Sequence, residues 1–236
     1  MNMTSVYKLS PTSPSLQTIY DLADTVKKIY RGGYVFNEGQ QSTDIFLIKS
    51  GIVRLSKLNS NGLPLNLRIC KTGDLIGDLT LFTDQSNYFL TAEAITPVEV
   101  YVVKREVVEN AVSSNPILAK EFIIWFNTHF QKTQSKYRDL ALYGKKGAVY
   151  STLIRMTNMY GKTQPNGSVL LDLPLTNQDL ANFCGYTSES IDFLLTDLIA
   201  LGVISVSSGY ITIKDIRYLQ NEIQCEGCSK EICCFD

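Results

Sequence analysis

Residues 175–198 read Leu175-Thr-Asn-Gln-Asp-Leu-Ala-Asn-Phe-Cys-Gly-Tyr-Thr-Ser-Glu-Ser-Ile-Asp-Phe-Leu-Leu-Thr-Asp-Leu198, and the fold of the chain can be argued from them. Apolar residues recur at helical spacing on both sides of Gly185, a residue type that accepts the backbone of a tight turn. Thr176 can cap the first helix, with Asp179 three residues later in the capping-box position. The stretch therefore predicts a helix-turn-helix.

The residues that follow predict a β-hairpin. Leu201–Ile213 contains two short runs rich in β-branched residues, separated by Ser207-Ser208-Gly209. A helix-turn-helix followed by such a β-hairpin, or wing, is an architecture typical of DNA-binding domains. The alternative is an unrelated helical hairpin beside an unrelated β-hairpin. We expect this domain at residues 145–220, with a helix over Ala148–Tyr160, a polar loop over Gly161–Gly167 and a short strand over Val169–Leu171.

Residues 28–112 have a different period. Short β-type runs are cut by glycines, and Asn61-Gly62 is a strong hairpin signal. This pattern predicts an antiparallel β-roll, preceded by a lead segment (1–27) with a helix near Ser15–Lys27. The expected strands are Tyr34–Phe36, Ile45–Ile48, Ile52–Leu58, Leu65–Cys70, Tyr88–Ala94 and Val98–Val103.

Residues 113–144 predict a long helix. Pro116 suits its first turn, Ser113 or Ser114 can cap it, and Gly144 suits its C-terminal end. The helix carries enough apolar residues for two faces, which favours packing on the roll and also on a second copy of the chain. A merely buried core helix is the alternative. The fold class is therefore α+β: β-roll, long helix, winged helix-turn-helix.

The segment 221–236 holds four of the six cysteines. Cys225 and Cys228 form a C-x-x-C step, Cys233 follows, and Cys234 is adjacent to it. Three sulfurs at this spacing can converge on an iron–sulfur cluster, on zinc, or in a redox disulfide.

Composition sets limits on the function. The net charge is −1, 44% of residues are hydrophobic, and no segment has the pattern of a signal peptide or membrane span. We therefore expect a cytoplasmic protein without membrane association, where structural disulfides are disfavoured. No acid–base pair accompanies a glycine-rich phosphate loop, and His129 has no evident nucleophile beside it, so an enzyme is not expected.

The β-roll segments Phe36–Gly39, Ile45–Gly51 and Gly73–Phe82, with Gly62, resemble the cyclic-nucleotide-type roll of the Crp–Fnr transcription regulators. In members that bind cyclic AMP, a glutamate contacts the ribose and an arginine–serine pair contacts the phosphate. Asp78 stands at the glutamate position, and Tyr88 and Phe89 stand at the arginine–serine positions. Aromatic rings cannot replace a bidentate guanidinium, so no cyclic nucleotide is expected.

The resemblance also implies a DNA-reading surface. Thr176 and Gln178 match positions that contact the DNA backbone, and Thr187, Ser188, Glu189 and Ser190 open the recognition helix. The family has arginines where this chain has Ser188 and Phe193, so the usual half-site is not expected. Residues 145–220 carry six acidic and six basic side chains, which is a weak electrostatic footprint for DNA.

The tail resembles that of the Gram-positive type of Fnr, in which three cysteines spaced C-x2-C-x4-C bind a [4Fe-4S] cluster. This resemblance implies Cys225, Cys228 and Cys233 as ligands and Asp139 as the fourth, with Cys234 as a possible replacement. From its surroundings alone, Asp139 would be an exposed helix acid paired with Arg138 or Lys136.

The implied function is oxygen-responsive control of anaerobic gene expression. The implied partners are double-stranded promoter DNA, RNA polymerase and a second copy of the chain. The alternative is a non-enzymatic thiol or zinc sensor of the same fold with altered or lost DNA specificity.

Overall fold

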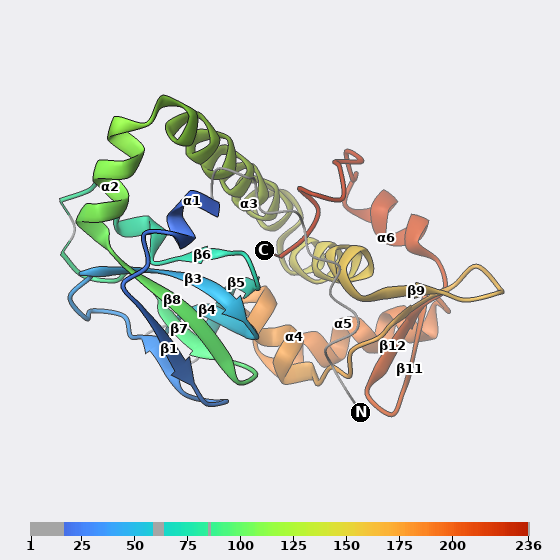
Figure 1. The fold of residues 1–236 in the computed structure, drawn as a ribbon. Coiled ribbons are helices and arrows are strands. Elements are labelled where there is room, and N and C mark those ends of the chain that lie inside the picture. The colour runs from blue at the N-terminus through green and yellow to red at the C-terminus, as the bar shows by residue number, and fades with distance from the viewer. Residues whose placement is uncertain (1–16, 59–63, 85, 236) are drawn as a thin grey trace. The chain divides into compact units, whose positions relative to one another are not determined.

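The computed structural model describes residues 17–58, 64–84 and 86–235 of the chain (Figure 1). These residues divide into two compact units: 17–58 and 66–127 (with a gap at 85) belong to the first, and 64–65 and 128–235 belong to the second. The expected Asn61-Gly62 hairpin turn and residues 1–16 lie outside the described residues.

Two four-stranded sheets make up most of the first unit (Figure 1). Their strand orders are β1-β8-β3-β6 and β2-β7-β4-β5, and the expected β-roll is confirmed. The strands are β1 (Thr25–Ile29), β2 (Tyr34–Phe36), β3 (Asp44–Ser50), β4 (Ile52–Leu58), β5 (Pro64–Lys71), β6 (Leu75–Ile76), β7 (Thr91–Ala94) and β8 (Val98–Lys104).

Strand β3 shows why both sheet faces are apolar. Phe46 and Ile48 join the core between the sheets, whereas Ile45 and Leu47 belong to a second cluster with helix residues. Successive side chains of a strand point to opposite faces, so a continuous apolar run indicates burial on both sides. Tyr88 belongs to the inter-sheet core, and its ring stacks on another aromatic ring there at 4.1 Å.

The start of the chain differs from the prediction. The helix expected over Ser15–Lys27 is reduced to α1 (Gln17–Tyr20) within the described residues, and strand β1 begins at Thr25. All five residues of β1 pair with β8, and this long-range ladder outweighs the helical spacing of the apolar residues. Strand β7 is also shorter than expected, because Tyr88 turns into the core before the strand begins.

Helix α2 (Arg105–Ser114) was not predicted and precedes the long helix α3 (Pro116–Tyr160). The cap of α3 is neither Ser113 nor Ser114. The Asn115 side chain accepts hydrogen bonds from the backbone N–H groups of the first turn at 3.1 and 3.2 Å.

A kink at Gly144 divides α3. Gly144 has φ 54° and ψ −136°, which side-chain-bearing residues rarely adopt. Gly147 then passes so close to the preceding segment that a Cβ there would lie 1.9 Å from the Asp139 carbonyl oxygen. Helical geometry therefore breaks at Gly144, the expected helix end, whereas the two compact units divide earlier, between Asn127 and Thr128.

The first half of α3 has two apolar faces, as its composition indicated. Leu118 and Phe122 are buried in the core formed with β3 and α2. Ile123, Phe126 and Phe130 are exposed by 67%, 51% and 52%.

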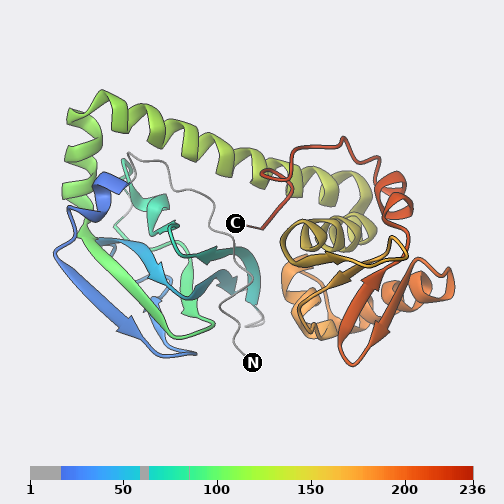
Figure 2. The same cartoon turned by 45° about the vertical axis from the view of Figure 1, so that its right-hand side comes forward.

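The second unit contains the expected winged helix-turn-helix (Figures 1 and 2). Gly185 makes the turn with φ 72°, and its N–H donates to the Ala181 carbonyl at 2.8 Å. Strand β9 lies inside the expected polar loop, and helix α6 was not predicted. The elements are β9 (Gly161–Thr163), β10 (Val169–Leu171), α4 (Asn177–Cys184), α5 (Ser188–Ala200), β11 (Ile204–Ser207), β12 (Tyr210–Ile213) and α6 (Ile216–Glu222), with sheet order β11-β12-β10-β9.

Among the residues described, no helix combines the length and apolar character required to cross a membrane.

Candidate functional site

The cysteine-rich tail lies along the last turns of α3 in the second unit (Figure 2). The Arg155 guanidinium donates to the Ile232 carbonyl at 3.2 Å. The Asn158 amide donates to the Cys233 carbonyl at 2.8 Å. These contacts fix the backbone on both sides of the Cys233 nitrogen, so the tail has a defined place on the domain that carries the helix-turn-helix.

Side chains at the end of the tail also enter the core of this unit. Cys233 and Phe235 are buried within the same apolar cluster as the helix-turn-helix core. The Phe235 ring lies 4.8 Å from the ring of Phe183 in α4, and the Lys136 ammonium lies 4.8 Å from the Phe235 ring centroid. The tail thus packs directly against the first helix of the DNA-binding module.

The three predicted cysteine ligands share one neighbourhood. Cys225 and Cys228 are half-buried and Cys233 is buried. Burial raises the pKa of the Cys233 thiol to about 12; the charge of Arg155 lowers it, whereas the thiols of Cys228 and Cys225 act in the same direction as burial. The Cys228 and Cys233 thiols share a hydrogen bond, so these two sulfurs lie together.

Asp139 is buried, with 2% exposure, and is not the exposed helix acid that its immediate sequence suggested. Its Oδ1 accepts from Arg138 at 2.6 Å, as expected from that sequence. Its Oδ2 accepts from Arg155 at 3.2 Å, a partner that the sequence did not indicate. Arg138 also pairs with Glu226 of the tail at 2.5 Å.

Electrostatics connect Asp139 to the tail cysteines. Partial burial opposes protonation of Arg138, but Asp139 first, and then Glu226 and Cys225, raise its pKa above the ordinary value. Cys225 therefore lies near Arg138, and Cys233 lies near Arg155. Asp139 and Cys233 thus lie at Arg155, and Cys225 lies near Arg138.

The donor set fits an iron–sulfur cluster in its chemistry, since three thiols and one carboxylate are available in one place. As they stand, however, no three Cys, His, Asp or Glu side chains of the described residues are close enough to hold a single metal ion. Both Asp139 oxygens are engaged by arginines, so ligation by Asp139 requires an arginine to withdraw. Cys234 is buried, and its thiol donates to the Glu231 carbonyl at 2.9 Å.

The predicted DNA contacts lie at the starts of α4 and α5. Thr176 and Asp179 form the expected capping box, with the Thr176 oxygen accepting from the Asp179 N–H at 3.1 Å. Thr187 caps α5 by accepting from the Ser190 N–H at 3.4 Å. Gln178 is exposed, and its amide donates to Asn182 at 2.9 Å.

The outward face of α5 is acidic. Glu189 is exposed, and hydrogen bonds from its own backbone N–H and from Thr187 lower its pKa. Phe193 is 67% exposed, and the Asp192 carboxylate accepts from Asn177 at 2.8 Å. A shallow hollow here has no basic lining residue; it is lined by Asn177, Ser188, Glu189, Asp192, Phe193 and Thr196.

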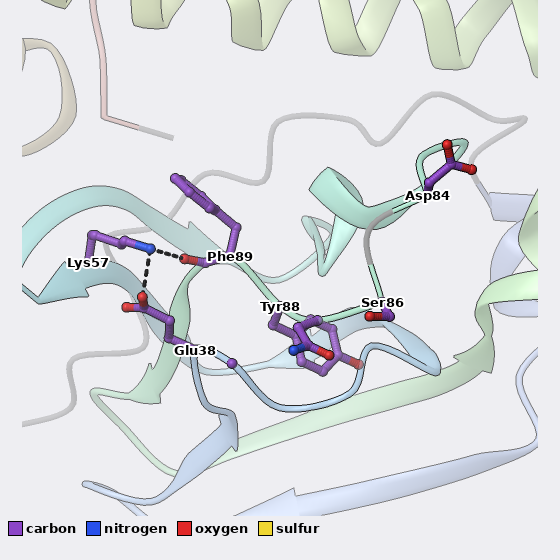
Figure 3. A pocket seen from close by; sticks show the side chains of 8 residues that line it. Glu38, Lys57, Asp84, Ser86, Tyr88 and Phe89 are labelled. Atoms are coloured by element: carbon purple, nitrogen blue, oxygen red, sulfur yellow. Dashed lines mark hydrogen bonds and ion pairs between the residues drawn. The ribbon is translucent and has the colours of Figure 1, made fainter.

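The roll has a surface hollow that includes Tyr88 and Phe89, the residues at the positions compared with cyclic-nucleotide-binding members (Figure 3). Lys57 is the basic residue of its lining, and Lys57 is already paired with Glu38 at 2.6 Å and with the Phe89 carbonyl at 3.1 Å. Tyr88 points into the core, where its hydroxyl donates to the Asp44 carbonyl at 2.7 Å.

The Asp78 carboxylate is also engaged within the protein, by Arg68. The Arg68 guanidinium donates to both of its carboxylate oxygens at 3.1 Å, and both side chains are largely buried. Asp78 and Tyr88, two of the residues at the compared positions, are therefore held by internal contacts, whereas the Phe89 side chain is 48% exposed.

A β-roll, a long helix and a winged helix-turn-helix, in this order, are the architecture of a transcription regulator with a DNA-binding domain at its C-terminal end. Residues 26–115 match the cyclic nucleotide-binding domain family, and residues 148–222 match the Crp-like helix-turn-helix domain family. The chain belongs to the Crp–Fnr family of transcription regulators, which confirms the resemblance and the expectation of a DNA-binding protein rather than an enzyme.

Individual relatives support this assignment. The chain is 44% identical to the anaerobic regulatory protein of Bacillus subtilis, over 95% of this chain and 94% of that protein. It is 28% identical to the lactate racemization regulatory protein of Lactiplantibacillus plantarum, over 84% and 90% of the two chains. A solved structure of a CooA mutant from Carboxydothermus hydrogenoformans has the same fold, with a TM-score of 0.71 and 17% identity over 87% and 90% of the chains.

Proposed function

We propose that this chain regulates transcription in response to oxygen, under the control of a [4Fe-4S] cluster held by Cys225, Cys228, Cys233 and Asp139. The proposal is supported by the ion pair of Asp139 with Arg155, by the hydrogen bond from Arg155 to the carbonyl before Cys233, and by the nearness of Cys225 to Arg138, all on the same unit as the helix-turn-helix. The 44% identical Bacillus relative is named an anaerobic regulatory protein, which agrees with this control.

When bound, the cluster supplies an inorganic centre whose stability depends on oxygen. The residues that would hold the cluster come from both sides of the Gly144 kink in α3. Asp139 precedes the Gly144 kink, whereas the tail rests on the helix segment that follows the kink. Ligation from both sides would hold the two segments together and so bias the orientation of the DNA-binding module.

A homodimer is part of the proposal. On α3 the exposed residues Ile123, Phe126, Phe130, Tyr137 and Leu140 follow alternating three- and four-residue steps that Thr133 completes. This is the spacing of a coiled-coil seam, and a seam on a surface helix is normally covered by a partner. The occupant we propose is the same helix of a second copy.

The proposed partners are promoter DNA and RNA polymerase, in the cytoplasm. DNA recognition would use Thr176, Gln178, Thr187, Ser188, Glu189 and Ser190, with Glu189 able to accept from a cytosine amino group. No cyclic nucleotide is included, because Tyr88 and Asp78 are committed to internal contacts and Lys57 to Glu38.

A second candidate is favoured by the acidic face of α5. A chain with Glu189 and Asp192 on its reading helix, and no basic residue in the adjoining hollow, suits a thiol or zinc sensor whose DNA specificity is altered or lost. Metal content separates the two proposals.

The test is the iron, sulfide and zinc content of protein purified without oxygen. We expect iron and acid-labile sulfide in the wild type, loss of both in Cys225→Ser, and wild-type amounts in the control Cys70→Ala, whose thiol is buried in the roll. Zinc in place of iron would support the zinc form of the second candidate, and absence of both metals would contradict the cluster and leave the thiol sensor.

A further inference from the structure

Arg155 is almost completely enclosed, and its contacts reach two distant parts of the chain. The side chain is 2% exposed. One terminal nitrogen donates to the Ile232 carbonyl at 3.2 Å. The other donates to Ser135 at 2.7 Å and to Asp139 at 3.2 Å. Its Nε is buried and has no partner among the described residues.

These contacts cross the kink in α3. Ser135 and Asp139 precede Gly144, Arg155 follows it, and Ile232 belongs to the tail. A single guanidinium therefore joins both helical segments to the backbone immediately before Cys233. A planar fork with several fixed donors can make such contacts together, whereas a lysine ammonium cannot reproduce their geometry.

The buried charges around Asp139 are unequal in number. Two guanidinium groups face one buried carboxylate, because Asp139 is shared by Arg138 and Arg155 and the side chain of Glu226 is 71% exposed. An arginine withdrawn from water is stabilised by anions nearby. Asp139 is therefore the buried carboxylate that holds Arg155 in place.

We propose that Arg155 is the positioning residue of the ligand set: it holds the backbone next to Cys233 and the Asp139 carboxylate in one neighbourhood. This inference rests on the proposed function for its relation to the cluster. Its structural part, the placement of the tail, holds for the metal-free chain as well. Groups that orient metal ligands in this way affect metal affinity by about 10–100-fold.

The experiment compares Arg155→Gln and Arg155→Lys with the wild type and with the control Lys146→Gln. Lys146 is an exposed basic residue of the same helix, paired with Glu222 at 3.4 Å. The first readout is the rate at which iodoacetamide alkylates Cys233 in reduced, metal-free protein, followed by peptide mass spectrometry. The second is iron and sulfide per chain after anaerobic reconstitution.

We expect Arg155→Gln to release the tail backbone and so expose Cys233 to several-fold faster alkylation, against the slower reaction that loss of the Arg155 charge alone would give by raising the pKa of the thiol. Iron affinity should fall by about 10-fold or more, the range seen when ligand-orienting groups are removed. Arg155→Lys keeps the charge and loses the fork, so its alkylation rate should also rise while it retains more iron. Lys146→Gln should match the wild type in both readouts.

Folded Arg155→Gln with wild-type alkylation and wild-type iron would overturn the inference. Circular dichroism establishes folding, and if Arg155→Gln does not fold, Arg155→Lys decides by the same criterion. If the wild type itself takes up no iron, the proposed function fails, and the alkylation rates alone decide the role of Arg155.

Discussion

Gly147 shows how one missing side chain sets the geometry of the candidate site. Its backbone passes the Asp139 carbonyl so closely that a Cβ would lie 1.9 Å from the oxygen. Any larger residue must push apart the two helical segments that carry Asp139 and Arg155. The close approach therefore requires glycine at this position.

We expect Gly147→Ala to lower the free energy of unfolding by about 2–3 kcal/mol, as overpacking does in a dense interior. Urea denaturation of the metal-free protein measures the change. Gly167→Ala is the control: it has φ +82° but open space around the new Cβ, so only a backbone cost of about 1 kcal/mol applies. An effect at Gly147 no larger than that at Gly167 would contradict the close approach.

At the residue scale, the sequence predicted the cysteine group and, through the resemblance, Asp139, but it did not predict their surroundings. Arg155 was missed, although a signal existed: it is the only charged residue between Ala148 and Tyr160. A lone charge in an apolar helix needs a buried partner. The identity of that partner depends on the Gly144 kink and on the path of the tail, which spacing alone does not reveal.

The tail behaves as an element of the DNA-binding unit because of Phe235. Its ring is buried against Phe183 of α4, and its backbone N–H lies 3.3 Å from the Met159 sulfur. Removing this ring removes the apolar contact that the tail makes with the helix-turn-helix.

We expect Phe235→Ala to destabilise the second unit by about 3 kcal/mol, the usual cost of truncating a buried phenylalanine. Hydrogen exchange should accelerate in the segment 225–235. Phe193→Ala, which truncates an exposed ring on α5, should change stability by less than about 0.5 kcal/mol. Equal effects of the two substitutions would show that the tail is not anchored through Phe235.

Sequence patterns located the elements that carry their own local signals. The Thr176 cap, the Gly185 turn and the wing at Ser208 and Gly209 were all predicted and are present. Strand β1 was mistaken for helix because its pairing with β8 is a long-range contact. Helices α2 and α6 were missed, and both are short elements that are stabilised by packing against neighbours.

Among the described residues, α3 carries an exposed apolar seam that includes Ile123, Phe126 and Phe130. We expect Ile123→Glu, on this seam, to convert a dimer to a monomer, because a charge opposite its own copy costs several kcal/mol at a buried interface. Leu142→Glu is the control, since Leu142 is equally exposed but lies off the seam on the same helix. Light scattering measures the mass, and a dimer that survives Ile123→Glu would contradict the proposed interface.

We propose that oxygen controls DNA binding by the whole molecule through the cluster. The most direct measurement is retention of pooled genomic DNA fragments, without oxygen, by the cluster-loaded chain, the metal-free chain and the Cys225→Ser variant, at equal protein concentration and fixed salt. We expect the loaded chain to retain a defined subset of fragments more strongly than the metal-free chain does. This difference should be lost on exposure to air and in the Cys225→Ser variant. Equal retention by the loaded and metal-free forms would contradict it.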